Sequence, residues 1–449
     1  MKRVKQRATA TLVIALALVL GLGLYVARYM AHGADWAMFA ANAALYDNAR
    51  LTVGTLIDRN GTVLAGFDDD GNRRFAESES VRRATLHVTG DKLGNIGTGA
   101  LKAFDARLAG YNAVTGAYSR VGRGATVALT IDAELSAVAL KALDGRRGAV
   151  LVMNYETGEL LCAVSSPTFD PENPPTITDG DTRYDGAYLN RGLSSTFTPG
   201  SVFKLITSAA AIENIPDIRT RTFTCTGSQT VGGERITCPE KHGELTFKDA
   251  LAVSCNVAFA ELSLELGADT LARYADRAGL LERLSLDGIL SAAGRFDEAE
   301  ADSAELAWSG IGQANDLASP LAMLRYVSAI ANGGEAAEPH LLLKTGLSSV
   351  LPREKTRLLN EKTASELAEL MANNVTAHYG ADNFAGLELH AKTGTAEVGV
   401  GKPPHAWFVG FIRNEGHPLA FAVIVENGGS GRLAAGGVAN SVLKAAIDN

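Results

Sequence analysis

The chain has 449 residues, of which 46% are hydrophobic and 20% are charged. This length exceeds what one typical hydrophobic core accommodates, so it predicts two folded modules and an anchor. The composition argues against general disorder. The formal net charge of −8 argues against a nucleic-acid partner, because phosphate binding requires concentrated lysine and arginine.

The first residues have a pattern typical of a membrane anchor. An uncharged run from Ala8 to Ala27 is closed by Arg28 and follows a basic cluster, Lys2, Arg3, Lys5 and Arg7. A helix of this length spans roughly 30 Å, the thickness of a bilayer's hydrocarbon core. We expect residues 1–7 to be a cytoplasmic tail, residues 8–27 to cross the cytoplasmic membrane once, and the rest to lie outside. A cleaved signal peptide is the alternative, but the run is long for one and Ala27-Arg28-Tyr29 is a poor cleavage site.

Residues 28–125 are polar and rich in glycine. The segment Leu51–Ala65 predicts two short strands joined by an Asn60-Gly61 turn, the dipeptide preferred in tight hairpins. Short apolar patches between glycines continue from Val81 to Leu108. We expect a small, β-rich N-terminal module here.

Residues 126–449 show the periodicities of a second domain. The spacing predicts a helix over 131–143 with Asp132 in its first turn, and a hairpin over 148–167 around Thr157-Gly158. It predicts a helix over 202–212 that is apolar on nearly every side and therefore buried. Further helices are expected over 248–266, 270–278, 320–331 and from Val438, and strands over 387–395, 406–413 and 419–426. Strands at both ends with helices between them predict one α+β domain, whose sheet joins distant segments.

Ser201 and Lys204 form an S-x-x-K pattern in the segment TPGSVFK, at the start of the buried helix. Residues three apart share one face of a helix, so the Lys204 amine can reach the Ser201 hydroxyl. A serine hydroxyl is a weak nucleophile until a base takes its proton. The positive end of the helix dipole disfavours the charged form of Lys204, so a neutral lysine base is plausible. This pattern alone is too short to be specific.

Two further motifs follow. Ser254-Cys255-Asn256 offers a hydroxyl and an amide within a predicted helix, and Lys392-Thr393-Gly394-Thr395 lies on a predicted strand whose side chains alternate between two faces. The order S-x-x-K, S-x-N, K-T-G is the signature of the penicillin-binding protein and serine β-lactamase superfamily.

The segment from about Thr130 to Asn449 resembles the transpeptidase domain of class B penicillin-binding proteins. The similar stretches include LNRGLSSTFTPGSVFK, ALAVSCNVAFAEL, SGIGQANDLASPLAMLRYVSAIANGG, AKTGTAE and HAWFVGF. The resemblance implies an antiparallel sheet flanked by helices, with an all-helical subdomain. Nearer the N-terminus, the stretch IDRNGTVLA is similar to the family's entry motif, R-G-x-I-x-D-R-x-G, although Val53 stands where arginine is usual.

The resemblance implies a peptidoglycan D,D-transpeptidase that acts on stem peptides ending in D-Ala-D-Ala and is acylated by β-lactams. Ser201 would be the acylated nucleophile and Lys204 its base. Ser254 would relay a proton to the leaving D-alanine, and Asn256 would hold the amide of the donor peptide. Acyl transfer of this kind needs no metal and no organic cofactor.

The third motif would bind the substrate. Lys392 would supply positive charge, and Thr393 and Thr395, on either side of Gly394, would bind the terminal carboxylate. The backbone N–H groups of Ser201 and Thr395 would form the oxyanion hole. The resemblance also implies a SEDS-family glycan polymerase as a partner in the membrane.

Other readings remain open. A D,D-carboxypeptidase, a β-lactamase and a β-lactam sensor share the three motifs, but an E-x-x-L-N element of class A β-lactamases is absent from the sequence. An inactive scaffold of the wall-synthesis complex is the alternative from another class.

The four cysteines are sparse, and two of them, Cys225 and Cys238, flank a loop-like stretch. In an oxidising compartment these two could form a disulfide, or they could remain free thiols. A zinc site that uses Cys238 and His242 lacks enough further ligands, so no metal is expected. Cys255 is expected to point into the core.

Overall fold

The computed structural model describes residues 2–37, 46–47, 50–51, 53–68, 70–111, 124–178, 181–297, 299–344, 354–399 and 401–448. Two compact units are present: one comprises residues 1–56, 65–74 and 104–127, and the other comprises residues 57–64, 75–103 and 128–449. Segments 38–45 and 112–123 of the expected N-terminal module lie outside the described residues. The domain boundary expected at residue 125 stays a prediction.

Helix α1 (Lys2–Ala37) contains the expected anchor. Its segment Lys2–Gly33 is long and apolar enough to cross a membrane, and no part of its 18-residue apolar window is buried against the rest of the protein. Large apolar side chains such as Leu12 and Leu24 are about 70% exposed. An apolar helical window that is exposed on all sides suits a lipid environment, and this feature suggests a single-pass membrane anchor.

The predicted hairpin near residue 60 is confirmed. Strands β3 (Thr55–Ile57) and β4 (Val63–Phe67) flank a turn in which the Asp58 N–H donates to the Thr62 carbonyl at 2.9 Å and Gly61 has φ +90°. With β5 (Arg73–Phe75) and β6 (Thr126–Ala128) they form a sheet in the order β5-β4-β3-β6. A separate antiparallel pair joins β1 (Tyr46–Asp47) and β2 (Arg50–Leu51).

Residues 79–108 differ from the expected β-rich module, because they are largely helical. They form α2 (Glu79–Thr89), α3 (Ala100–Ala103) and α4 (Asp105–Leu108). The buried residues Val81, Ala84 and Val88 recur at the three- and four-residue spacing of a helix. That spacing, rather than the neighbouring glycines, decides the local structure.

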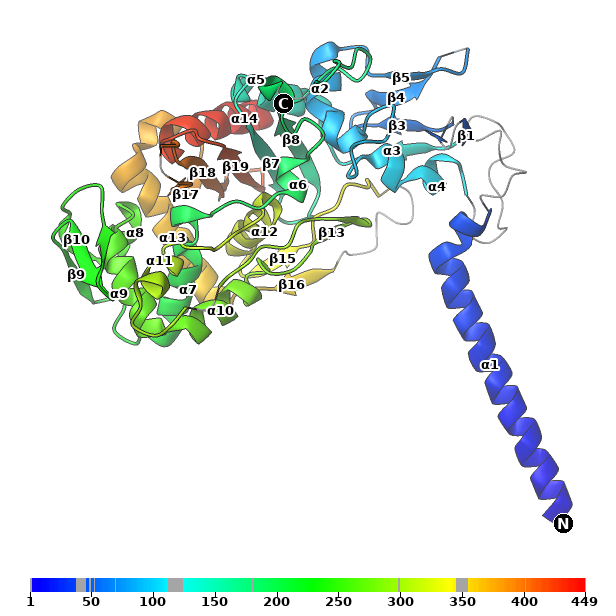
Figure 1. Ribbon diagram of the computed structural model, residues 1–449, viewed down its shortest axis with the longest axis horizontal. Helices are drawn as coiled ribbons and strands as arrows, with labels where there is room; N and C mark the ends of the chain where they lie inside the picture. Colours follow the sequence, from blue (N-terminus) through cyan, green and yellow to red (C-terminus); the bar gives the residue numbers. More distant parts are fainter. Residues whose placement is uncertain are drawn as a thin grey trace. The chain divides into compact units, whose positions relative to one another are not determined.

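A five-stranded antiparallel sheet forms the centre of the second unit, in the order β17-β18-β19-β7-β8. Its strands are β7 (Gly148–Asn154), β8 (Leu160–Ser166), β17 (Leu389–Ala396), β18 (His405–Ile412) and β19 (Leu419–Val425). As predicted, strands from both ends of the domain meet, since β19 pairs with β7. Nearly every residue of β7, β18 and β19 is buried, because helices cover both faces (Figure 1).

Helices α5 (Ala133–Leu143) and α14 (Gly436–Asp448) lie on one face of this sheet, and α12 (Pro320–Ala331) lies on the other (Figure 1). Asp132 caps α5, and its side chain accepts a hydrogen bond from the Leu135 N–H. Ser319 caps α12 in the same way, and Pro320 occupies its first position, where a missing N–H costs nothing. The helices predicted over 131–143, 320–331 and from Val438 are therefore confirmed.

The expected helical subdomain is also present. It contains α7 (Lys204–Asn214), α8 (Phe247–Ala252), α9 (Asn256–Leu266), α10 (Ala268–Arg277), α11 (Ala304–Ser309) and α13 (Glu361–Asn374), and the short α6 (Arg191–Ser194) precedes it. Two ribbons lie between α7 and α8: β9 (Thr222–Cys225) pairs with β12 (Gly243–Thr246), and β10 (Ser228–Val231) pairs with β11 (Glu234–Thr237). Hairpins β13–β14 (Ser285–Leu286, Ile289–Leu290) and β15–β16 (Glu335–Ala337, Lys355–Arg357) complete this part.

Candidate active site

Ser201 lies in a tight turn, Gly200–Val202, directly before α7. Two long-range contacts hold this turn: the Trp407 Nε1–H donates to the Thr198 carbonyl at 3.0 Å, and the Gly200 N–H donates to the Gly312 carbonyl at 2.7 Å. Gly312 has φ +81°, and a Cβ atom there would lie 2.2 Å from the Gly200 carbonyl oxygen. The close approach of these two loops therefore requires glycine at position 312.

Lys204 begins α7, and its side chain is fully buried. Its Nζ donates to the Ser254 carbonyl at 2.7 Å and to Asn256 Oδ1 at 2.8 Å, and lies 3.3 Å from Ser254 Oγ. Burial lowers the pKa of Lys204 to about 7, although Cys255 and Cys238 partly oppose this shift. A neutral amine has two N–H donors and one lone pair, so two carbonyl-type acceptors leave the lone pair available for a proton.

The segment around Ser254 departs from the predicted continuous helix over 248–266. Helix α8 ends at Ala252 and α9 begins at Asn256, because Ser254 adopts the left-handed conformation with φ +57°. This conformation is uncommon outside glycine and points to a functional constraint. The break frees the Ser254 carbonyl from helical bonding and turns it toward Lys204.

Lys392 approaches the same hydroxyl from β17. Its Nζ lies 3.0 Å from Ser254 Oγ and 2.9 Å from the Thr393 carbonyl, and its side chain is fully buried. Burial, and after it the charge of Lys204, lower the pKa of Lys392 well below its usual value. Two buried amines that share one hydroxyl repel each other when both are charged, so they favour a state in which only one of them is an ammonium ion.

The two threonines of β17 face the cavity. Thr393 is half-buried and Thr395 is exposed, whereas Lys392 and Gly394 are buried, as the predicted alternation requires. A Cβ atom at position 394 would lie 3.0 Å from the Pro199 carbonyl oxygen. Glycine thus lets the strand approach the Ser201 turn closely.

Tyr379 also belongs to the site, although it was not among the residues predicted from the sequence. Its phenolic oxygen accepts the Thr393 N–H at 3.0 Å and the Thr393 hydroxyl at 3.2 Å. Tyr379 ends a π-helical turn, Val375–Tyr379, that follows α13, and burial raises its pKa to about 12. A π-turn often marks a functional position, but nothing in the local sequence pattern reveals it.

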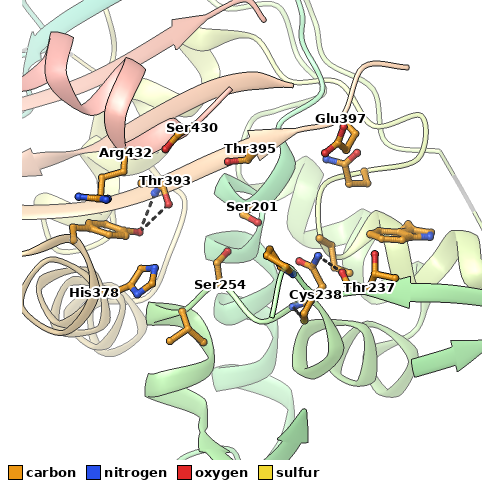
Figure 2. Close-up of a pocket in the computed structure, with 18 of the residues that line it drawn as sticks. Ser201, Thr237, Cys238, Ser254, His378, Thr393, Thr395, Glu397, Ser430 and Arg432 are labelled. Atoms are coloured by element: carbon orange, nitrogen blue, oxygen red, sulfur yellow. Dashed lines mark hydrogen bonds between the residues drawn. The ribbon is translucent and has the colours of Figure 1, made fainter. Parts of the chain in front are cut away.

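These residues surround one cavity of about 680 Å³. In Figure 2, Ser201, Ser254, Thr393 and Thr395 gather around a common space. The other walls come from the ribbon residues Thr237 and Cys238 and from loop and helix residues, including Gln313, His378, Glu397, Ser430 and Arg432. The sequence-predicted residues Ser201, Ser254, Asn256, Thr393 and Thr395 all line this cavity, and Lys204 and Lys392 lie directly behind it.

The cysteines follow one of the two alternatives that the sequence leaves open. All four are free thiols, so the disulfide that Cys225 and Cys238 could form is not present in this structure. The expectation that Cys238 and His242 lack enough further metal ligands is wrong. Cys225, Cys238, His242 and Cys255 place their ligand atoms within 4.8 Å of one another, because the fold returns Cys255 to the ribbons. Cys255 is buried, as expected.

Known proteins share this arrangement. Residues 148–448 match the family model described as the penicillin-binding protein transpeptidase domain. The peptidoglycan D,D-transpeptidase PbpA of Mycolicibacterium smegmatis is 31% identical over 91% of this chain and 92% of its own length.

Two solved structures extend the comparison. Penicillin-binding protein A from M. tuberculosis, as a ceftriaxone acyl-enzyme complex, has a TM-score of 0.75 and 26% identity over 88% of this chain and 98% of that chain. The penicillin-binding protein PBP2 from Helicobacter pylori, in complex with MreC, has a TM-score of 0.64 and 26% identity over 72% of this chain and 64% of that one. With the three motifs assembled around one cavity and a family match over two thirds of its length, the chain belongs to the penicillin-binding protein transpeptidase family.

Proposed function

We propose that this protein is a serine D,D-transpeptidase that cross-links peptidoglycan stem peptides ending in D-Ala-D-Ala, and that β-lactams inhibit it by acylating Ser201. The observation that carries the proposal is the meeting of two buried lysines, Lys204 and Lys392, at the Ser254 hydroxyl beside Ser201. The relatives named D,D-transpeptidase and the acyl-enzyme of a structural neighbour support it.

In the first half-reaction, neutral Lys204 takes the proton of Ser201 Oγ, which attacks the carbonyl carbon between the two D-alanines. The backbone N–H groups of Ser201 and Thr395 stabilise the oxyanion, and such a donor contributes about 3 kcal/mol in serine hydrolases. The close approach of Gly394 to the Ser201 turn supports this role. The peptide C–N bond then breaks, and Ser254 passes the proton from Lys204 to the nitrogen of the departing D-alanine.

Substrate binding follows from the polarity of the walls. Thr393 and Thr395 bind the terminal carboxylate, with Lys392 behind them as the source of positive charge. Asn256 holds the amide of the donor peptide through its side chain. In the second half-reaction, an amine of a neighbouring stem peptide attacks the ester carbon. The new C–N amide bond forms, the C–O bond to Ser201 breaks, and the proton lost by the amine returns to Ser201 Oγ.

The proposal includes the membrane setting. Residues 1–7 stay in the cytoplasm, residues 8–27 form the anchor, residues 28–125 form the N-terminal module, and the transpeptidase domain, residues 126–449, lies outside. The basic cluster before the apolar run supports this orientation. A SEDS-family glycan polymerase is the proposed partner in the membrane. The complex of Helicobacter pylori PBP2 with MreC supports the existence of a protein partner.

Labelling with a fluorescent penicillin tests the nucleophile. Ser201→Ala should abolish covalent labelling and leave the thermal unfolding transition in place, because it removes one hydroxyl from a half-buried position. Ser208→Ala, the same substitution further along α7 at a buried serine, is the matched control and should label fully. Labelling of Ser201→Ala at the wild-type level would remove Ser201 from its role.

A second assay separates synthesis from hydrolysis and from an inactive scaffold. The full-length protein is incubated with stem-peptide donor strands and an acceptor amine, and the products are separated by mass. Cross-linked dimers with release of D-alanine are the expected products. Shortened donor without dimers would instead identify a carboxypeptidase, and no reaction would identify a scaffold.

A further inference from the structure

Four side chains with metal-binding atoms converge beside the active-site cavity. Cys225 ends β9, Cys238 follows β11, His242 precedes β12, and Cys255 lies between Ser254 and Asn256. Their spacing is C-x12-C-x3-H-x12-C, and their ligand atoms all lie within 4.8 Å of one another. Cys225 and Cys255 are buried, and Cys238 and His242 are half-buried.

The distances within this cluster fit a tetrahedral metal. Zinc bonds of about 2.3 Å to sulfur and about 2.05 Å to nitrogen give tetrahedral edges of about 3.8 Å between sulfurs and about 3.6 Å between sulfur and nitrogen. The Cys238 and Cys255 sulfurs lie 3.8 Å apart, and Cys225 Sγ lies 3.4 Å from His242 Nδ1. These two distances are opposite edges of the expected tetrahedron, and both are close to the lengths that a bound zinc ion requires.

We propose that Cys225, Cys238, His242 and Cys255 bind one zinc ion, which fixes the Ser254–Asn256 segment of the active site to the neighbouring ribbons. Three thiolates and one imidazole are a donor set that selects zinc among the common divalent ions, and four protein ligands close the coordination shell, as in structural sites. The three thiols lose their protons on binding, and His242 contributes the lone pair of Nδ1.

The surroundings of the cluster suit thiolate ligands. Three thiolates and Zn²⁺ carry one net negative charge, and N–H groups that donate to sulfur stabilise it. The Asn256 N–H donates to Cys238 Sγ at 3.1 Å, and the Ala258 N–H donates to Cys255 Sγ at 3.5 Å, both at the start of α9.

The position of the cluster explains what the metal does. The ribbons β9–β12 and β10–β11 are two-stranded and bury few apolar residues, and isolated two-stranded hairpins are marginally stable. Zinc would hold both ribbons together. It would also fix Cys255, whose neighbour Ser254 is in the left-handed conformation and touches both buried lysines.

A second link runs through Asn256. Its Nδ2–H donates to the Thr237 carbonyl at 2.7 Å, while its Oδ1 accepts from Lys204. Thr237 and Cys238 line the cavity (Figure 2). The metal ligands thus flank both catalytic side chains of the S-x-N motif, so Cys255 and Cys238 act as positioning residues and do not touch the reacting atoms.

Metal content of the full-length, detergent-solubilised protein tests the site. We expect one zinc per chain after gel filtration in metal-free buffer, and thiolate-to-cobalt charge-transfer bands together with the visible bands of tetrahedral Co²⁺ when cobalt replaces zinc. Cys225→Ser and His242→Ala should lose the metal. Cys162→Ala changes a buried cysteine outside the cluster and is the matched control that should keep it. Protein free of metal with a disulfide between Cys225 and Cys238, or zinc retained equally by all variants, would overturn the proposal.

Acylation kinetics test the positioning role, and they use wild-type protein so that a folding defect of a variant cannot decide the result. Zinc is removed with a chelator under reducing conditions and then returned. We expect acylation of Ser201 by penicillin to slow by about tenfold or more without zinc, which is the range found for groups that orient a site, and to recover on reloading. An acylation rate that does not respond to zinc would refute the positioning role. Metal content is measured without any reaction, so this site and the transpeptidase proposal can fail separately.

Discussion

The pH dependence of acylation should report the protonation of Lys204. Burial lowers the pKa of this amine to about 7, and only the neutral amine can take the proton of Ser201. With that pKa, the neutral fraction is about a tenth at pH 6, about a half at pH 7 and about nine tenths at pH 8. The rate constant for acylation by a fluorescent penicillin should therefore rise about tenfold between pH 6 and pH 8 and then level off.

The variant Asn256→Asp sharpens this test because it is nearly isosteric. It places a carboxylate where Asn256 Oδ1 now accepts the Lys204 Nζ–H at 2.8 Å. An opposite charge at this distance favours the ammonium form, so the midpoint should move to higher pH by about one unit or more. Acylation at pH 7 should then fall about fivefold or more and recover at pH 9. A wild-type profile that is flat or falls between pH 6 and pH 8 would refute the assignment of Lys204 as the base.

Three further outcomes are expected. The acyl-enzyme formed from penicillin should persist for many minutes in intact-mass measurements. Lys204 is engaged in acylation, and Glu397, at the rim of the cavity, is not expected to activate water. Turnover within seconds would indicate a β-lactamase. A reporter that is active only in the cytoplasm, fused after Asn449, should be silent, and a strong signal would reverse the topology. Gly312→Ala should lower the free energy of unfolding by about 1–3 kcal/mol in urea denaturation, since its Cβ would lie 2.2 Å from the Gly200 carbonyl oxygen. Gly416→Ala, where a Cβ meets nothing within 4 Å, is its control for the loss of glycine at positive φ, and equal effects would contradict the packing argument.

Much of the catalytic domain could be predicted from the sequence because its signals are local. The apolar runs of β7 and β8 flank a turn, and Asp132 and Ser319 cap the helices that follow them. Such features depend on backbone preferences and side-chain periodicity over a few residues. The three motifs were recognisable for a related reason, since each occupies a short segment in a set order.

Other features of the site were decided by contacts between distant segments. The sequence pattern of residues 248–266 predicts one continuous helix. In the structure, two buried amines from α7 and β17 surround Ser254, which adopts the left-handed conformation and interrupts the helix. Tyr379 reaches Thr393 only because the end of α13 packs on β17.

The cysteines illustrate the same division. Cys238 and His242 are close in the sequence and offer two ligands, which is too few for a zinc site. Cys225 and Cys255 complete the set of four only after β9 pairs with β12 and α9 packs against the ribbons. Residue types and spacing thus determined the chemistry available to this protein. Tertiary packing decided which groups meet, because burial and proximity depend on segments far apart in the chain.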